Sequence, residues 1–292
     1  MSLDEAFLQE ICDHPDDDAP RLVYADWLEE HGDGDRAEFI RTQCELARLG
    51  ADDPRRPGLE AREGALLERH GPRWARPVAG LVARWRFARG FVESVTMAPG
   101  PFLTQHETLF RLAPVRAVAF YNAAGVVADL GACPALRRLS TVAFSGTSFP
   151  GGGEGHGMVL SLAGDQGTYI GDAGAQALAA SPYIDQLNAL YLVGNALTAV
   201  GARALAASPH LAGLTHLDLY GNGLGLSLPE YLSRTVARFF RAVGPGGVCA
   251  AVQALIASPY LTRLTWLNLR GNRLGEADRQ ALRTHFGDAV LV

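Results

Sequence analysis

Leucine residues recur at a fixed spacing in the second part of the chain. Three segments, at 187–197, 214–224 and 264–274, fit the pattern Leu-x-x-Leu-x-Leu-x-x-Asn-x-Leu. The alternation of leucine with other residues at the centre of this pattern has the period of two that is typical of a β-strand. Each copy therefore predicts a short strand with its leucines on one face and the intervening residues on the other.

An alanine-rich pattern precedes each of these predicted strands. Ala-Leu-Ala-Ala-Ser-Pro occurs at 177–182 and 204–209, and Ala-Leu-Ile-Ala-Ser-Pro occurs at 254–259. Alanine and leucine favour a helix, and the residue before a proline tends to end one. One strand and one helix cannot bury a core alone, whereas stacked copies can. The pattern thus predicts a chain of stacked strand–helix units.

The spacing of the copies predicts two inserts. Asn195 and Asn222 are 27 residues apart, but Asn222 and Asn272 are 50 residues apart. Weaker copies upstream begin at Leu139, Val115 and Val92, so six repeats are expected, with 286–292 as a closing strand. The long intervals place inserts near 150–170 and 225–247.

Residues 91–292 resemble leucine-rich repeats of the ribonuclease-inhibitor-like class, which have a helix in each repeat. The resemblance implies an α/β fold, a leucine-rich-repeat solenoid with parallel strands on its concave side and helices on its convex side. Asn195, Asn222 and Asn272 would lie where the strands turn. There they are expected to form a structural ladder, in which side-chain amides bond backbone groups of adjacent turns.

The N-terminal region shows the longer period of amphipathic helices. Helices are expected at 3–12, 20–31, 36–49 and 58–75. Leu3, Phe7, Leu8 and Ile11 would form the apolar face of the first helix, Leu22, Val23, Trp27 and Leu28 that of the second, and Phe39, Ile40, Cys44 and Leu46 that of the third. Asp35 is a plausible N-cap for the third helix.

The sequence Pro-Asp-Asp-Asp-Ala-Pro-Arg-Leu-Val-Tyr-Ala-Asp-Trp-Leu-Glu-Glu at 15–30, followed by Arg-Ala-Glu-Phe-Ile-Arg, resembles the bacterial repeat-companion domain. That family occurs at the N-terminus of repeat proteins and implies no known catalytic activity. The expected organisation is a helical repeat-companion domain at 1–50, a helical bridge or cap at 51–90, and the solenoid at 91–292. The helical region as a whole would be an all-α cap on the first repeats.

Charge is unevenly distributed along the 292 residues, whose formal net charge is −5. Residues 1–35 carry 12 acidic side chains and one arginine, whereas 36–90 carry 12 arginines and seven acidic side chains. These arginines would pair with the acidic segment or lie in solvent, and the alternative is contact with nucleic acid. The four cysteines have no Cys-x-x-Cys spacing, and the acidic start does not resemble a secretory signal, so the cytoplasm is expected.

The residues between the leucines of the later repeats are aromatic and charged. They are Tyr191, His216, Asp218, Tyr220, Trp266, Asn268 and Arg270. In a leucine-rich solenoid they would face the concave surface, and such residues are common at interface hot spots. We therefore expect this face to bind a protein or peptide, with Tyr191, Tyr220 and Trp266 as anchors.

The second insert predicts a helix from Pro229 to Val243 with Arg234, Arg238 and Arg241 on one stripe. This helix would either dock on a partner or membrane surface, or pack on the solenoid edge with its arginines in water; the second interpretation is favoured. Membrane binding is accordingly not expected.

No catalytic motif and no metal-ligand spacing is apparent. Asp16, Asp17 and Asp18 lack the alternation of a calcium loop, and the glycine-rich 151–157 lacks the ending of a phosphate loop. The prediction is a monomeric, non-enzymatic binding scaffold without a cofactor or metal. The alternatives are nucleic-acid binding through 36–90 and 234–241, or a regulatory subunit of a larger complex.

Overall fold

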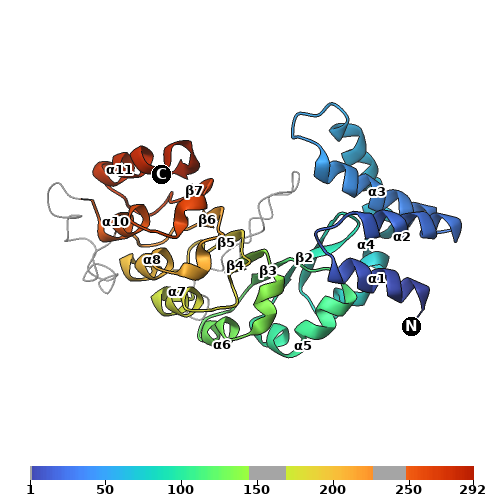
Figure 1. The fold of residues 1–292 in the computed structure, drawn as a ribbon, viewed down its shortest axis with the longest axis horizontal. Coiled ribbons are helices and arrows are strands. Elements are labelled where there is room, and N and C mark those ends of the chain that lie inside the picture. The colour runs from blue at the N-terminus through green and yellow to red at the C-terminus, as the bar shows by residue number, and fades with distance from the viewer. Residues whose placement is uncertain (1, 145–168, 226–247) are drawn as a thin grey trace. The chain divides into compact units, whose positions relative to one another are not determined.

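The computed structural model describes residues 2–144, 169–225 and 248–292. The chain divides into two compact units. Unit 1 comprises Met1–Met97 and Thr104–Val118, and unit 2 comprises Ala98–Leu103 and Ala119–Val292. The eight strands of the described residues form one sheet in which they follow one another in chain order (Figure 1). The structure is thus a mixed α/β fold.

Unit 1 begins with the four helices that the sequence pattern predicted. They are α1 (Leu3–Asp13), α2 (Ala19–Glu30), α3 (Gly34–Arg48) and α4 (Arg56–Ala79). Ser2 and Glu5 form a capping box at the start of α1, and Pro20 lies in the first turn of α2. The N-cap of α3 is Asp33, so the choice of Asp35 was wrong; Asp35 lies in the first turn, where its charge still suits the helix dipole.

The helices of unit 1 pack around a small aromatic and aliphatic core. Ile11, Leu28, Ile40 and Cys44 are buried together with Phe91. Two residues that were assigned to apolar helix faces are instead exposed, Leu3 by 58% and Val23 by 55%. Leu3 lies in the first turn of α1, and Val23 lies on the side of α2 that points away from this core. Both expectations were wrong.

A β-hairpin follows α4 in unit 1, and the sequence analysis missed it. β1 (Arg84–Ala88) pairs antiparallel with β2 (Phe91–Met97), so the predicted bridge 51–90 is not wholly helical. Gly90 makes the turn with φ +89°, and a Cβ there would lie 2.5 Å from Cγ1 of Ile40. Glycine is therefore required both by the backbone conformation and by the close approach of α3.

Unit 2 consists of strand–helix repeats, as the leucine spacing predicted. Its strands are β4 (Thr141–Phe144), β5 (Ala189–Tyr191), β6 (His216–Asp218), β7 (Trp266–Asn268) and the closing β8 (Val290–Leu291). These strands pair in parallel from β4 to β8. The leucines of the pattern point into the core; Leu190, Leu217 and Leu267 are each 0% exposed.

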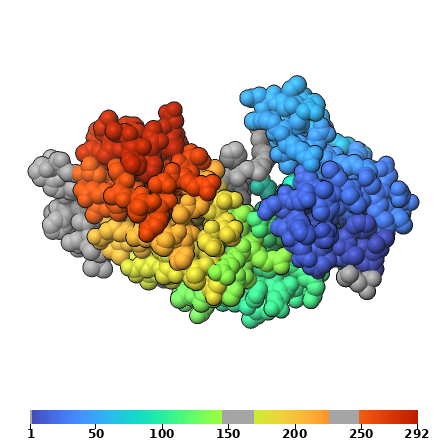
Figure 2. Space-filling view, viewed as in Figure 1, coloured from blue at the N-terminus to red at the C-terminus, as the bar shows by residue number. Residues whose placement is uncertain are grey.

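Helices and short 3-10 turns connect the strands and lie along one side of the sheet in unit 2 (Figure 1). The helices are α6 (Val127–Gly131), α7 (Gly171–Ala179), α8 (Ala199–Ala206), α10 (Ala250–Ile256) and α11 (Glu276–Phe286). The 3-10 turns are η1 (Pro134–Arg138), η2 (Pro209–Leu211), η3 (Leu261–Arg263) and η4 (Gly287–Ala289). Residues of α5 (Pro99–Leu112) and β3 (Ala117–Phe120) occur in both units. In the space-filling view the later strand–helix repeats form adjacent bands (Figure 2).

Buried asparagine side chains join successive strand–helix repeats of unit 2. The Asn222 side-chain oxygen accepts the backbone N–H groups of Asn195 and Leu197 at 2.9 and 3.0 Å. Its amide donates to the carbonyls of Leu192 and Leu219 at 2.8 and 2.9 Å. One side chain thereby satisfies backbone groups in its own turn and in the preceding one.

The other two asparagines of the pattern make bonds of the same kind. The amide of Asn272 donates to the carbonyl of Leu219 at 2.7 Å, and that of Asn195 donates to the carbonyl of Phe144 at 3.3 Å. Asn195 and Asn272 are almost completely buried. Since a buried polar group without a partner is destabilising, the three asparagines fix the spacing of the turns.

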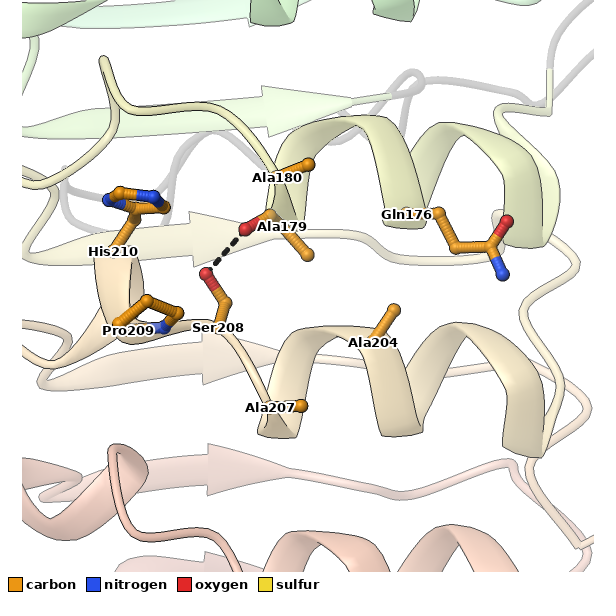
Figure 3. Close-up of a pocket in the computed structure, with 8 residues that line it drawn as sticks. All are labelled: Gln176, Ala179, Ala180, Ala204, Ala207, Ser208, Pro209 and His210. Carbon is orange, nitrogen blue, oxygen red and sulfur yellow. Dashed lines mark hydrogen bonds between the residues drawn. The ribbon is translucent and has the colours of Figure 1, made fainter.

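A second ladder uses the serines of the Ala-Ser-Pro sequences. Each hydroxyl donates to a backbone carbonyl near the end of the preceding helix at 2.5–2.6 Å, from Ser181 to Gly131, from Ser208 to Ala179, and from Ser258 to Ala206. Figure 3 shows the bond from Ser208 to Ala179. The sequence analysis interpreted these serines only as part of a helix stop. Their recurrence at the same place in each copy was the signal of this second role.

Candidate functional site

Three neighbouring strands of unit 2 bring together five of the seven residues expected to bind a partner. Tyr191 of β5, Asp218 of β6 and Asn268 of β7 occupy one row across the sheet. His216 and Trp266 occupy the adjacent row with Ala189. These side chains alternate with the buried leucines and so lie on the opposite side of the sheet from the helices. We call the five residues the aromatic face.

The rings of the aromatic face contact one another. The centroid of Trp266 lies 6.1 Å from that of His216, in a stacked arrangement, and 6.4 Å from that of Tyr191. Tyr191 is only 8% exposed, because it packs with Trp266 and with Ala119 and Ala143 of earlier strands. Trp266 is half-buried and His216 is exposed, so these two offer more ring surface than Tyr191.

Asp218 is the one acidic side chain of the aromatic face, and it is 8% exposed. Burial raises its pKa, while the Tyr220 backbone N–H and the Asn268 side chain, which donate hydrogen bonds to it, oppose that rise. The bond from Tyr220 is 2.9 Å long. Burial and the negative charge of Asp218 also raise the pKa of the Tyr191 hydroxyl. Among the described residues, no cationic side chain lies within 4.0 Å of the carboxylate.

The remaining two predicted residues, Tyr220 and Arg270, follow the strands in the next row. Tyr220 is 47% exposed and Arg270 is exposed. The backbone N–H of Arg270 donates to the side-chain oxygen of Asn268 at 3.2 Å. The turns that follow pack closely, since a Cβ on Gly271 would lie 3.2 Å from the Cα of Gly221. This row therefore adds one large ring and one cation beside the aromatic face.

Arg234, Arg238 and Arg241 lie outside the described residues, as do both predicted inserts apart from their ends. The proposed contacts of the second insert stay predictions.

Most arginines of 36–90 form ion pairs within unit 1. Arg41 pairs with Asp26 and Glu29 at 2.6 and 2.7 Å, and Arg48 pairs with Asp18 at 2.8 Å. Arg55, Arg56, Arg62, Arg69, Arg73 and Arg89 also have acidic partners. Within the described part of the chain, the arginines of this segment without an ion pair are Arg36, Arg76, Arg84 and Arg86. Most positive charges of this segment are therefore paired with carboxylates of unit 1.

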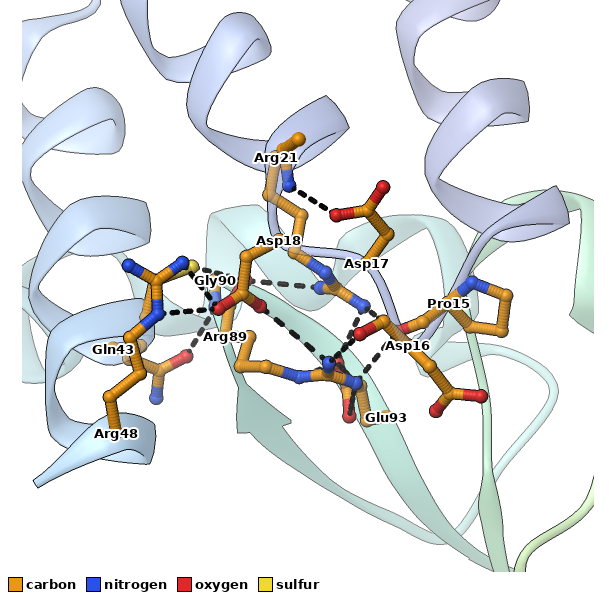
Figure 4. A network of polar contacts seen from close by, with 12 residues as sticks. Pro15, Asp16, Asp17, Asp18, Arg21, Gln43, Arg48, Arg89, Gly90 and Glu93 are labelled. Carbon is orange, nitrogen blue, oxygen red and sulfur yellow. Dashed lines mark hydrogen bonds and ion pairs between the residues drawn. The ribbon is translucent and has the colours of Figure 1, made fainter.

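A buried network joins the start of α2 to the β-hairpin (Figure 4). Arg21 is 0% exposed, pairs with Glu93 at 2.7 Å and donates to the carbonyls of Pro15 and Arg89 at 2.8 and 3.1 Å. Arg89 pairs with the same Glu93 at 3.0 Å. Burial lowers the pKa of Arg21 and raises that of Glu93, and the ion pair opposes both shifts.

The three consecutive aspartates take part in this unit as caps and ion-pair partners. Asp17 accepts the backbone N–H of Ala19 at 2.8 Å, and Asp16 pairs with Arg116 at 3.0 Å. Asp18 pairs with Arg48. In the described ranges no group of three or more histidine, cysteine or acidic side chains is arranged to hold a metal ion.

A shallow groove of about 310 Å³ runs between α7 and α8 of unit 2 (Figure 3). Its walls are mainly alanines, including Ala179, Ala204 and Ala207, with His210 at one end. The hydroxyl of Ser208 is already bonded to the carbonyl of Ala179. The groove thus presents few polar groups that could bind a ligand.

Comparison with protein families gives one match in this unit. Residues 213–234 match the family model described as Leucine Rich Repeat. The chain contains a leucine-rich repeat. No curated protein matches the chain.

The matched leucine-rich repeat includes part of the candidate site. His216, Asp218 and Tyr220 lie within it, as does the ladder residue Asn222. Leucine-rich repeats are commonly protein–protein interaction modules, and repeats of this kind offer extended surfaces for binding. None of the described helices is both long and apolar enough to span a bilayer.

Proposed function

We propose that the chain is a non-enzymatic protein-binding scaffold. The aromatic face, with Tyr220 and Arg270, would be the concave binding surface of a ribonuclease-inhibitor-like solenoid. The N-terminal helices would be a repeat-companion domain that caps the solenoid. The observation that carries the proposal is the grouping of Tyr191, Trp266 and Tyr220 with charged residues within and beside the segment that matches a leucine-rich repeat.

The composition of this surface supports protein recognition. Tyrosine, tryptophan and arginine are enriched among the residues that contribute most to protein–protein affinity. Trp266 and Tyr220 retain exposed surface and are held on strands or on the turns that follow them. Rigid placement lowers the entropy lost on binding, so side chains in this position are suited to act as anchors.

Nucleic-acid binding through 36–90 is the weaker alternative. Affinity for nucleic acid depends on cations that can neutralise phosphates, and most arginines of this segment are engaged by carboxylates. Strong, salt-sensitive retention on DNA or RNA would favour this alternative over the scaffold.

Affinity capture from native lysate tests the proposal. The full chain should retain a specific protein, and Trp266→Ala and Tyr220→Ala should each weaken that complex by at least about 1 kcal/mol, or roughly fivefold in Kd. His210→Ala is the matched control, because His210 lies by the groove between the helices. Equal binding by all three variants would refute the role of the aromatic face.

A further inference from the structure

The carboxylate of Asp218 is buried without a counterion among the described residues. A buried charge is normally paired, since the desolvation of an ionised carboxylate is strongly unfavourable. Asp278, the second buried aspartate in the described part of unit 2, accepts the backbone N–H groups of Cys249 and Gly275 and caps helices. Asp218 lies on a strand, where it accepts the backbone N–H of Tyr220 and a hydrogen bond from Asn268, both of which a neutral side chain such as that of Asn268 could also accept. Its placement therefore calls for another explanation.

The carboxylate keeps unused capacity to accept hydrogen bonds. It receives one from the backbone N–H of Tyr220 and one from the side chain of Asn268. An ionised carboxylate has about four lone-pair sites. A donor arriving from a ligand could therefore bond to Asp218 without displacing either existing partner.

The surroundings of Asp218 favour a planar cation. Tyr191 is its neighbour in the same row, and the stacked pair of His216 and Trp266 occupies the adjacent row. Aromatic faces attract cations, and a guanidinium group can stack on a ring while it donates two parallel hydrogen bonds to a carboxylate. The ammonium group of lysine lacks this planar fork.

We propose that Asp218 binds an arginine side chain of a partner protein, with the rings of Trp266 and Tyr191 beside the guanidinium. This inference rests on the proposed function, because it names the chemistry that the aromatic face recognises. Arg270, two residues after Asn268, is exposed, and its positive charge would repel an arginine of the ligand. Its removal should strengthen binding of an arginine-containing ligand.

An array of randomised dodecamer peptides tests this inference on the full chain. Arginine should be enriched among the peptides bound by the wild-type protein, and Asp218→Asn should abolish the enrichment. Replacing arginine by citrulline in a bound peptide, which keeps the shape and removes the charge, should lower affinity at least tenfold in the wild type and no more than twofold in Asp218→Asn. Arg270→Gln should raise affinity for the arginine peptide about twofold or more. A cooperative thermal unfolding transition in each variant would show that the variants are folded.

Two results would overturn the inference. One is binding of neutral or acidic peptides that depends on Trp266 and Tyr220 but not on Asp218, which would leave the proposed function intact. The other is the absence of any arginine preference in the wild-type protein, including the case in which no peptide is bound. In that case the lysate capture with Trp266→Ala decides separately whether the aromatic face binds a folded partner.

Discussion

The two units of the molecule bury polar groups in different ways. In unit 1 the buried polar side chains include the charged groups Arg21, Arg36 and Glu93. In unit 2 they are mainly the amides and hydroxyls of the repeats, such as Asn222 and Ser208. A neutral side chain loses less solvation energy on burial than an ionised one. Because the same asparagine or serine recurs in each repeat, it forms the same hydrogen bonds to the backbone in each turn. In unit 1 the charged side chain of Arg21 bonds to the carbonyls of Pro15 and Arg89, a set of contacts that is not repeated along its helices.

This comparison shows which buried charges need a functional explanation. Arg21 and Glu93 compensate each other. Arg36 lies among the rings of Phe39, Trp74, Phe87 and Phe91, with its guanidinium carbon 4.8–5.9 Å from their centroids, and burial lowers its pKa to about 10. Among the buried polar side chains that the structure describes in unit 2, Asp218 departs from a pattern of neutral or capping groups.

The largest effect is expected in unit 1. Arg21→Ala removes the fully buried cation that pairs with Glu93, leaves this carboxylate with Arg89 alone and removes the hydrogen bonds to the carbonyls of Pro15 and Arg89. These losses together should lower the free energy of unfolding by about 3–5 kcal/mol. Urea denaturation followed by tryptophan fluorescence measures it, since Trp27, Trp74 and Trp85 belong to this unit. Arg41→Ala is the control, because that ion-paired side chain is partly exposed and its loss should change stability by no more than about 1 kcal/mol.

The double variant Arg21→Met with Glu93→Leu sharpens this test. Replacing both charges by apolar groups removes the desolvation penalty together with the attraction, so the double variant should be more stable than Arg21→Ala. Equal losses for Arg21→Ala and Arg41→Ala would show that the buried network does not stabilise unit 1 in the way described.

The next largest effect is expected from the asparagine ladder of unit 2. Asn222→Ala leaves the backbone N–H groups of Asn195 and Leu197 without their acceptor, at about 1–3 kcal/mol for a buried group, so a loss of about 3 kcal/mol is expected. Circular dichroism in increasing urea measures the change. The control is Asn188→Ala, an exposed asparagine of the same unit, which should stay within about 0.5 kcal/mol of the wild type. Similar behaviour of both variants would contradict the structural role of the ladder.

The sequence predicted the elements of unit 2 better than those of unit 1, for a physical reason. Strands β5, β6 and β7 have the same leucines and are each followed by the same asparagine, so three copies support one prediction. The register also placed Tyr191, Asp218 and Asn268 on one side. β1 has five residues and no second copy, and alternation over so few positions is too short to indicate a strand. The burial of Arg21 depends on Glu93, which lies far along the chain, so local pattern carries no sign of it.

The contacts within the candidate site could not be predicted from the sequence either. Register fixes which residues share a face, but not how far each ring is covered. Tyr191 was expected to be an anchor, and its 8% exposure follows from packing against alanines that appeared featureless in the sequence. Spacing likewise could not predict that no described cationic side chain pairs with Asp218, because this depends on the rotamers of its neighbours.

The smallest effect, and the one most specific to the comparison, concerns Asp218. Because burial raises the pKa of this carboxyl in the folded state, the folded chain binds its proton more tightly than the unfolded chain, whose carboxyl titrates near pH 3.9. Stability is therefore lost as the pH rises from the unfolded pKa through the folded one. Asp218→Asn has no such titration. It should melt at a higher temperature than the wild type at pH 7, and the difference should shrink towards pH 3.

Asp172→Asn provides the opposite control in the same unit. Its carboxylate accepts bonds of 2.6–2.9 Å from Thr198 and Gly201, so the amide should lower the melting temperature at pH 7. If Asp218→Asn also lowered the melting temperature at pH 7, the carboxylate would be a structural group like that of Asp172. A gain in stability together with a loss of arginine binding would instead show that unit 2 keeps this charge at the expense of its own stability, as binding sites often do.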